Sequence, residues 1–206
     1  TWLTVGQGVS KREGVGGHYG EDDYEHIDNI RDDLLDYNYT LVHRDYASVS
    51  GVYSSAAIIS EHINAGVSII NYCNHGSPSS WGVFSYDNDD VNALVNDDKL
   101  PFIISVACNN GQFDHDECFA EAWMRAKNPS TGNPTGAIGG MFSWISQPWL
   151  PPMYGQDEMN AILTEWRPGY KHTLGGASCN GNKSILDKTP NVDGENTHNT
   201  WILFGD

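Results

Sequence analysis

The sequence predicts a doubly wound α/β fold, in which a mostly parallel sheet carries helices on both faces. Short apolar runs alternate along the chain with segments whose apolar residues recur at helical spacing, as in repeated strand-helix units. Two of the runs, residues 67–72 and 102–107, have the character of parallel strands that are buried on both faces. The sequence contains no internal repeat and no low-complexity tract, so we expect one layered unit.

Each element of this fold has a local signal. Strands are expected at residues 2–9, 39–43, 67–72, 102–107, 135–143 and 200–204. Helices are expected at residues 23–36, 56–63, 89–95, 118–127 and 155–166. Acidic residues precede the apolar positions of the first helix, at the favourable end of its dipole. Ser54 or Ser55 can cap the second helix, and Gly66 ends it.

Three segments are harder to assign. Residues 144–152 are rich in aromatic residues and proline, and we expect a loop at the carboxyl end of a strand. Residues 175–187 have helical character that Gly181 interrupts. Residues 188–199 have the composition of turns.

The charge of the chain limits its partners. Its 206 residues include 27 acidic and 11 basic side chains, and the formal net charge is −16. This charge opposes binding to nucleic acid or to an anionic membrane, attracts basic ligands, and suits an extracellular, calcium-rich or saline setting. No run of 18 apolar residues predicts a membrane span. Because strand-like residues stand at both ends, we expect a piece of a longer protein.

A histidine and a cysteine each follow one of the buried strands. His75 comes shortly after residue 72, and Cys108 directly follows the run that begins at residue 102. The carboxyl ends of parallel strands line a common crevice, so the two side chains can face one cleft. A thiolate is the attacking form of cysteine and needs a neighbouring base near neutral pH. The alternative interpretation is an exposed loop histidine and a small buried cysteine.

The other cysteines do not form a recognised motif. Cys73, Cys108, Cys118 and Cys179 show no C-x-x-C spacing, which argues against a zinc knuckle and against a thioredoxin-like site.

The motifs around these strand ends resemble those of the gingipain family of secreted bacterial cysteine endopeptidases. The resemblance is closer to the arginine-specific members than to the lysine-specific ones, and it extends over essentially the whole chain. It is carried by Asn74-His75-Gly76-Ser77, by Val106-Ala107-Cys108-Asn109-Asn110-Gly111, by Cys118-Phe119-Ala120-Glu121-Ala122 and by Gly155-Gln156-Asp157-Glu158-Met159-Asn160. Asn74 departs from the glycine that is usual before the histidine, and Cys73 and Pro78 are further departures.

The resemblance implies a caspase-like α/β fold. Residues 1–206 would form a single catalytic subdomain, and a second subdomain would precede it in the same protein. His75 matches the catalytic histidine of the family and Cys108 its nucleophile. The backbone amides of Gly76 and Cys108 match the oxyanion hole. Glu13 resembles the third catalytic member, which orients the imidazole, although a solvated glutamate is the alternative.

The resemblance also implies a pocket for a basic side chain. Asp23 matches the acid at its base, and its walls match Gln147, Trp149 and Met153. An aromatic slot with a carboxylate is what recognition of a guanidinium requires. The alternatives are a helix-start acid at position 23 and a loop anchor at position 149.

These observations predict a secreted or cell-surface cysteine endopeptidase that cleaves after basic residues, preferably Arg, through a thioester acyl-enzyme. Its partners would be peptide or protein substrates with Arg or Lys at the cleaved bond. The rival hypotheses are a sortase-like transpeptidase of the same family and a degenerate binding module without activity. Catalysis needs no cofactor, but the resemblance implies structural Ca²⁺. No ligand set can be chosen, because the acidic residues 87–90 lack the full EF-hand pattern.

Overall fold

A sheet with strand order β2-β1-β3-β6-β7-β8 forms the centre of the protein. The computed structural model describes residues 1–14, 16–17, 19–114 and 116–205. Its strands are β1 (Val5–Lys11), β2 (Leu41–Ala47), β3 (Ile69–Cys73), β6 (Phe102–Val106), β7 (Gly139–Ser143) and β8 (Trp201–Gly205). Neighbouring strands run parallel, except that β8 is antiparallel to β7. A short hairpin, β4 (Gly76–Ser77) with β5 (Ser80–Trp81), stands apart from the sheet.

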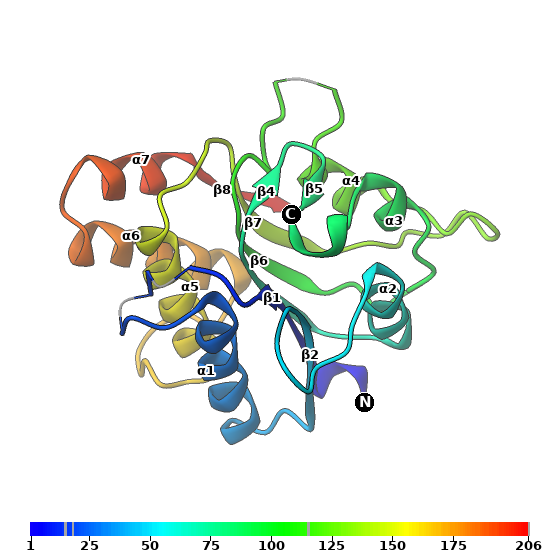
Figure 1. Ribbon diagram of the computed structural model, residues 1–206, viewed down its shortest axis with the longest axis horizontal. Coiled ribbons are helices and arrows are strands. Elements are labelled where there is room, and N and C mark those ends of the chain that lie inside the picture. Colours follow the sequence, from blue (N-terminus) through cyan, green and yellow to red (C-terminus); the bar gives the residue numbers. More distant parts are fainter. Residues whose placement is uncertain (15, 18, 115, 206) are drawn as a thin grey trace.

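Helices cover both faces of this sheet, as Figure 1 shows. The α-helices are α1 (Asp23–Asp36), α2 (Ala56–Ala65), α3 (Asn88–Asn92), α4 (Phe119–Arg125), α5 (Leu150–Leu163), α6 (Leu174–Lys188) and α7 (Val192–Thr200), and the short 3₁₀ helices are η1 (Trp2–Thr4) and η2 (Val83–Ser85). On one face α1 packs against β1 and β3, and α5 packs against β6. On the other face α2 contacts β2, while α4 contacts β7 and β8. The predicted α/β class and the mostly parallel sheet are confirmed.

Several local predictions are confirmed to the residue or nearly so. The first helix spans Asp23–Asp36 as expected. The second begins after Ser55, whose hydroxyl accepts a hydrogen bond from the Ile58 amide at 3.3 Å, and it ends at Gly66 with a positive φ of 111°. The local signals were strong here because capping chemistry and hydrophobic periodicity agreed.

The C-terminal third contains more helix than predicted. The expected loop 144–152 was partly wrong, because α5 already begins at Leu150 and includes Pro151 and Pro152. Proline is tolerated in the first turn of a helix, where its missing amide proton has no intrahelical acceptor. The prediction that Gly181 interrupts this helix was wrong, because α6 continues through it. Glycine is present for a packing reason: a Cβ at this position would clash with Met159.

The prediction of turns for residues 188–199 was also wrong. These residues include α7, whose start is capped by Asn191. The side chain of Asn191 accepts hydrogen bonds from the amides of Asp193 at 3.0 Å and Gly194 at 3.1 Å. Polar composition concealed this helix, because it lacks a clear apolar stripe.

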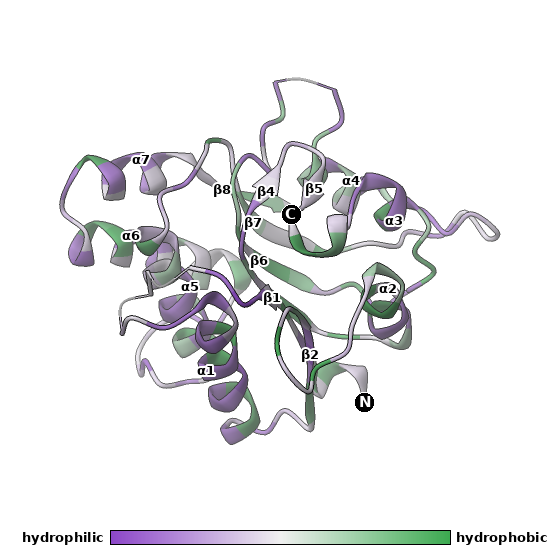
Figure 2. Cartoon of the chain, in the orientation of Figure 1, coloured by the Kyte–Doolittle hydropathy of each residue, from purple (hydrophilic) through white to green (hydrophobic). Residues whose placement is uncertain are grey.

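Two cores hold the layers together. On the α2–α4 face, Trp81 stacks on Tyr72 with ring centroids 4.4 Å apart and donates a hydrogen bond to the Ser105 hydroxyl at 3.0 Å. On the α1–α5 face, the core includes Ile27 and Met153. Figure 2 shows the central strands as hydrophobic and long hydrophilic stretches on α1. Within the described residues, no helix combines the length and the apolar character needed to cross a bilayer.

Candidate active site

His75 and Cys108 lie at the carboxyl ends of two neighbouring strands. β3 and β6 pair in parallel register, with Cys73 opposite Val106. The chain then continues from each strand into the same region, and His75 and Cys108 line one small cavity of about 30 Å³. The His75 side chain is 54% exposed and Cys108 is half-buried, so both are accessible to a ligand. The predicted juxtaposition of thiol and imidazole is therefore present.

The backbone of His75 is held by its own hairpin. Its carbonyl oxygen accepts hydrogen bonds from the Tyr72 hydroxyl at 2.6 Å and from the Gly82 amide at 2.8 Å. The imidazole meets the edge of Trp149, with ring centroids 5.2 Å apart. These contacts fix the point from which the histidine side chain reaches the cavity.

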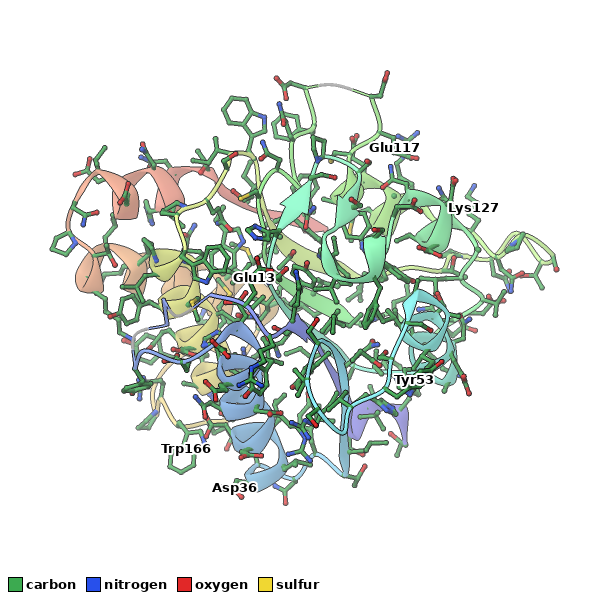
Figure 3. All side chains as sticks on the ribbon, in the orientation of Figure 1. Glu13, Asp36, Tyr53, Glu117, Lys127 and Trp166 are labelled. Carbon is green, nitrogen blue, oxygen red and sulfur yellow. The ribbon has the colours of Figure 1, made fainter. Side chains whose placement is uncertain are left out.

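Glu13 reaches the imidazole from the segment after β1. Its Oε1 lies 3.3 Å from Nε2 of His75, and its Oε2 forms an ion pair with Nζ of Lys11 at 2.8 Å. The hydrogen bond from Lys11 and its positive charge lower the pKa of Glu13, assisted by His75. Figure 3 labels Glu13 near the centre of the view. An ionised carboxylate at this position can orient the imidazole.

The turn after β6 is held against the turn after β3. Asn109 adopts a left-handed backbone conformation with a φ of 60°, which asparagine tolerates. Its backbone amide donates a hydrogen bond to the Ile145 carbonyl oxygen at 3.0 Å. Asn110 donates from Nδ2 to the carbonyl oxygens of Ser77 at 2.7 Å and Ser80 at 2.9 Å. This side chain ties the cysteine turn to the hairpin that follows His75.

Gly76 makes close contact with the cysteine turn. A Cβ at this position would lie 2.7 Å from the carbonyl oxygen of Cys108 and 2.8 Å from Cβ of Ala107. No larger residue fits without movement of the backbone. The structure thus brings together the two residues whose amides the resemblance assigns to an oxyanion hole.

Cys108 differs from the other thiols in its surroundings. Its Sγ lies 3.8 Å from the carbonyl oxygen of Gln147. Cys73 also lines the cavity but is 1% exposed, and burial raises the pKa of its thiol. Cys118 is buried at the start of α4, and burial raises the pKa of its thiol to about 11. Thiolate formation is disfavoured at both buried cysteines.

Asp23, the first residue of α1, is fully buried beside the cavity. Its Oδ1 accepts a hydrogen bond from Nε1 of Trp149 at 2.8 Å, and its Oδ2 accepts one from Nδ2 of Asn74 at 2.7 Å. Its amide donates to the Glu13 carbonyl at 3.0 Å. Burial raises the pKa of Asp23 to about 6, although the two side-chain hydrogen bonds favour the charged form. The predicted acid and the predicted aromatic wall are therefore in direct contact.

The other residues of the predicted pocket differ in their access to the cavity. Gln147 and Trp149 line the cavity, whereas Met153 is fully buried in the core beneath. Both polar atoms of the Gln147 side chain are shielded from solvent and have no hydrogen-bond partner among the described residues. A buried amide with unused donors and acceptors is suited to a polar ligand.

Sequence reasoning assigned no role to three polar contributors to this region, although it noted Asn74 as a departure from the family motif. Lys11 supports Glu13, and Asn74 supports Asp23. His26 is buried on α1, where its Nε2 lies 3.0 Å from Oε1 of Gln156. The position of Asn74, directly before His75, is a signal that could have identified it. A single lysine at a strand end or a single histidine in a helix gives no such signal.

The acidic segment considered for calcium has another role in the structure. Asp87 caps α3 and accepts hydrogen bonds from the amides of Asp89 at 2.9 Å and Asp90 at 3.2 Å. Across residues 1–14, 16–17, 19–114 and 116–205, no group of three or more histidine, cysteine, aspartate or glutamate side chains is arranged to hold a metal ion. Because Ca²⁺ also binds backbone and amide oxygens, the expectation of structural Ca²⁺ stays a prediction.

A mostly parallel sheet with a cysteine and a histidine at paired strand ends defines the class as a caspase-like α/β cysteine peptidase fold. The chain belongs to peptidase family C25, whose family model matches residues 3–206.

Two curated relatives and one solved structure are similar to this chain. Gingipain R2 of Porphyromonas gingivalis (strain ATCC BAA-308 / W83) is 40% identical over 208 residues, which cover 100% of this chain and 27% of that protein. Lys-gingipain of Porphyromonas gingivalis (strain ATCC 33277) is 31% identical over 172 residues, covering 82% of this chain and 9% of that protein. The crystal structure of the Arg-specific cysteine proteinase gingipain R matches with a TM-score of 0.92 and 41% identity, over 100% of this chain and 46% of that one.

The buried charge at Asp23 predicts a pH-dependent cost to stability. A carboxyl pKa that rises to about 6 on folding, from 3.8, means that the folded state binds more protons between these values, so stability falls as pH rises through this range. The shift corresponds to about 3 kcal/mol of folding free energy.

Urea unfolding of the wild type and Asp23→Asn should therefore give a difference in the free energy of unfolding that changes by up to this amount between about pH 4 and pH 7. Asp32→Asn, exposed on the same helix, is the control. If the difference in the free energy of unfolding between wild type and Asp23→Asn did not change with pH, the raised pKa of Asp23 would be wrong.

Proposed function

We propose that this chain carries the active site of a cysteine endopeptidase that cleaves peptide bonds after basic residues, with Arg preferred over Lys. The observation that carries the proposal is the shared cavity of His75 and Cys108, with Asp23 buried directly behind the wall formed by Asn74 and Trp149. The higher identity to Gingipain R2, at 40%, than to Lys-gingipain, at 31%, supports Arg as the preferred residue.

The reaction would proceed through a thioester. His75 takes the proton of Cys108, and the sulfur attacks the carbonyl carbon of the substrate. With Nε2 facing Glu13, the other ring nitrogen, Nδ1, is the one available to the thiol. The resulting imidazolium returns its proton to the leaving amine as the peptide bond breaks. Water, deprotonated by the same imidazole, then hydrolyses the thioester and regenerates the thiol.

Two parts of the site would stabilise this chemistry. The amides of Gly76 and Cys108, which belong to two turns in close contact, would donate hydrogen bonds to the oxygen on which charge develops. Glu13, kept ionised by Lys11, would orient His75 and stabilise its charged form. A contact in the structure and the resemblance of the motifs support each of these proposed roles.

The pocket would recognise the basic side chain before the cleaved bond. The Asp23 carboxylate would pair with the guanidinium, and Trp149 would lie along the aliphatic stem. Gln147 would supply its unused amide, and Met153 would support the pocket from below. The net charge of −16 favours approach of basic substrates.

The proposal extends to the setting of the enzyme. The chain spans 27% of Gingipain R2 and 46% of the gingipain R crystal structure, so a preceding subdomain of the same protein is part of the proposal. A secreted or cell-surface location is inferred from the acidic composition and from the family. Structural Ca²⁺ is retained as a proposal on the family resemblance alone.

The identity of the nucleophile is tested by removing each thiol of the cavity. Cys108→Ala should reduce hydrolysis of an arginyl peptide by at least about a thousandfold, because the acyl-enzyme can no longer form. Cys73→Ala is the matched control and should retain most of the activity, since this thiol is buried and its charged form is disfavoured. Loss of activity in Cys73→Ala with activity retained in Cys108→Ala would identify Cys73 as the nucleophile instead.

The specificity acid is tested with matched arginyl and lysyl peptides. Asp23→Asn should lower kcat/KM for the arginyl peptide by at least about tenfold, because loss of one partner from a buried charge pair costs about 2–5 kcal/mol. Alkylation of Cys108 by iodoacetamide should remain, as that reagent does not use the pocket. Asp22→Asn, one residue earlier, is the control. Equal use of Arg and Lys by the wild type, or an equal loss in the control, would refute the assignment.

A further inference from the structure

Asn74 lies between the cavity and the buried acid. Its side chain is 6% exposed, and its Nδ2 donates a hydrogen bond of 2.7 Å to Oδ2 of Asp23. Its backbone amide donates to the Val106 carbonyl at 3.2 Å, which anchors it at the junction of β3 and β6. Asn74 also lines the cavity, whereas Asp23 does not.

A ligand that enters the cavity therefore meets Asn74 and Trp149 before it meets the carboxylate. Each of these residues already donates to one oxygen of Asp23, Trp149 to Oδ1 and Asn74 to Oδ2. Because the carboxylate requires donors, the amide nitrogen of Asn74 is the atom that faces it, and its Oδ1 remains as an acceptor.

This arrangement affects arginine and lysine differently. A guanidinium pairs best with a carboxylate through two parallel N–H···O bonds, which need both oxygens in one orientation. The hydrogen bond from Asn74 takes up acceptor capacity on Oδ2 and fills space on the path to it. An ammonium makes a point contact and can use a single oxygen, including the neutral Oδ1 of Asn74.

We propose that Asn74 is a specificity-determining residue that acts through Asp23, occupying one carboxylate oxygen and narrowing the advantage of Arg over Lys at the cleaved bond. This inference rests on the proposed function and refines it. Arg remains preferred, but the wild-type enzyme also accepts Lys because Asn74 shields the acid.

The test removes the amide and keeps Cβ. Asn74→Ala should raise the ratio of kcat/KM for an arginyl peptide over the matched lysyl peptide by at least about fivefold. The change should appear mainly in KM for the arginyl peptide, because the amide affects binding and not the attack of the thiol. In a protein that already carries Asp23→Asn, adding Asn74→Ala should not change the ratio from that of Asp23→Asn alone, since the acid through which Asn74 acts is then absent.

Three kinetic outcomes would overturn the inference. One is a ratio that falls, or that rises by less than about fivefold, in Asn74→Ala. Another is an equal loss with both peptides together with slower alkylation of Cys108 by iodoacetamide, which would mean that Asn74 only supports the histidine turn. An equal ratio change with and without Asp23 would also refute action through the acid.

A readout without substrate separates this inference from the proposed function. In nitrogen-15 NMR spectra, the side-chain amide signals of Asn74 should shift as Asp23 titrates and should lose this response in Asp23→Asn. If neither peptide is cleaved but the amide signals respond, the proposed function fails and the contact between Asn74 and Asp23 stands. If the peptides are cleaved but the Asn74 amide signals do not respond to the titration of Asp23, the inference about Asn74 fails and the proposed function stands.

Discussion

The parallel pairing of β3 with β6 is the constraint on which the site depends. It fixes the register in which Cys73 lies opposite Val106, so the turns that carry His75 and Cys108 leave the sheet side by side. A slip of one residue would turn every side chain of one strand to the opposite face. Asn110 and Gly76 secure the same arrangement above the sheet, through two hydrogen bonds to the hairpin and through a contact that only glycine permits.

The buried carboxylate of Asp23 opposes the stability of the fold, and it is also the acid proposed to recognise the substrate. Its burial raises its pKa to about 6, which means that ionisation of this acid lowers the free energy of unfolding near neutral pH. Trp149 and Asn74 offset part of this cost with one hydrogen bond to each oxygen. The same two contacts hold the acid in place and, in the proposed function, separate it from the ligand, so selectivity and stability would depend on the same few atoms.

The sequence was sufficient for the elements whose signals agree with one another. The helix at Asp23–Asp36, the capped start of α2 and the placement of His75 and Cys108 at one sheet edge all followed from periodicity, capping and strand order. The resemblance added Glu13 and Trp149, which the structure places against His75 and Asp23. The start of α5 and the whole of α7 were missed because proline and polar composition are compatible with both loops and helix starts. The hydrogen bond from Asn74 could not be predicted, since it depends on the separation of two side chains distant in sequence.

Activation of Cys108 by His75 is tested most directly by the rate of Cys108 alkylation by iodoacetamide as a function of pH. An unassisted thiol has a pKa of about 8.5 and reacts slowly at neutral pH. Activation by His75 predicts that wild-type Cys108 reacts substantially faster than Cys108 in His75→Ala between pH 6 and pH 7, and that the difference narrows at alkaline pH. Equal rates in the two proteins across the range would contradict it.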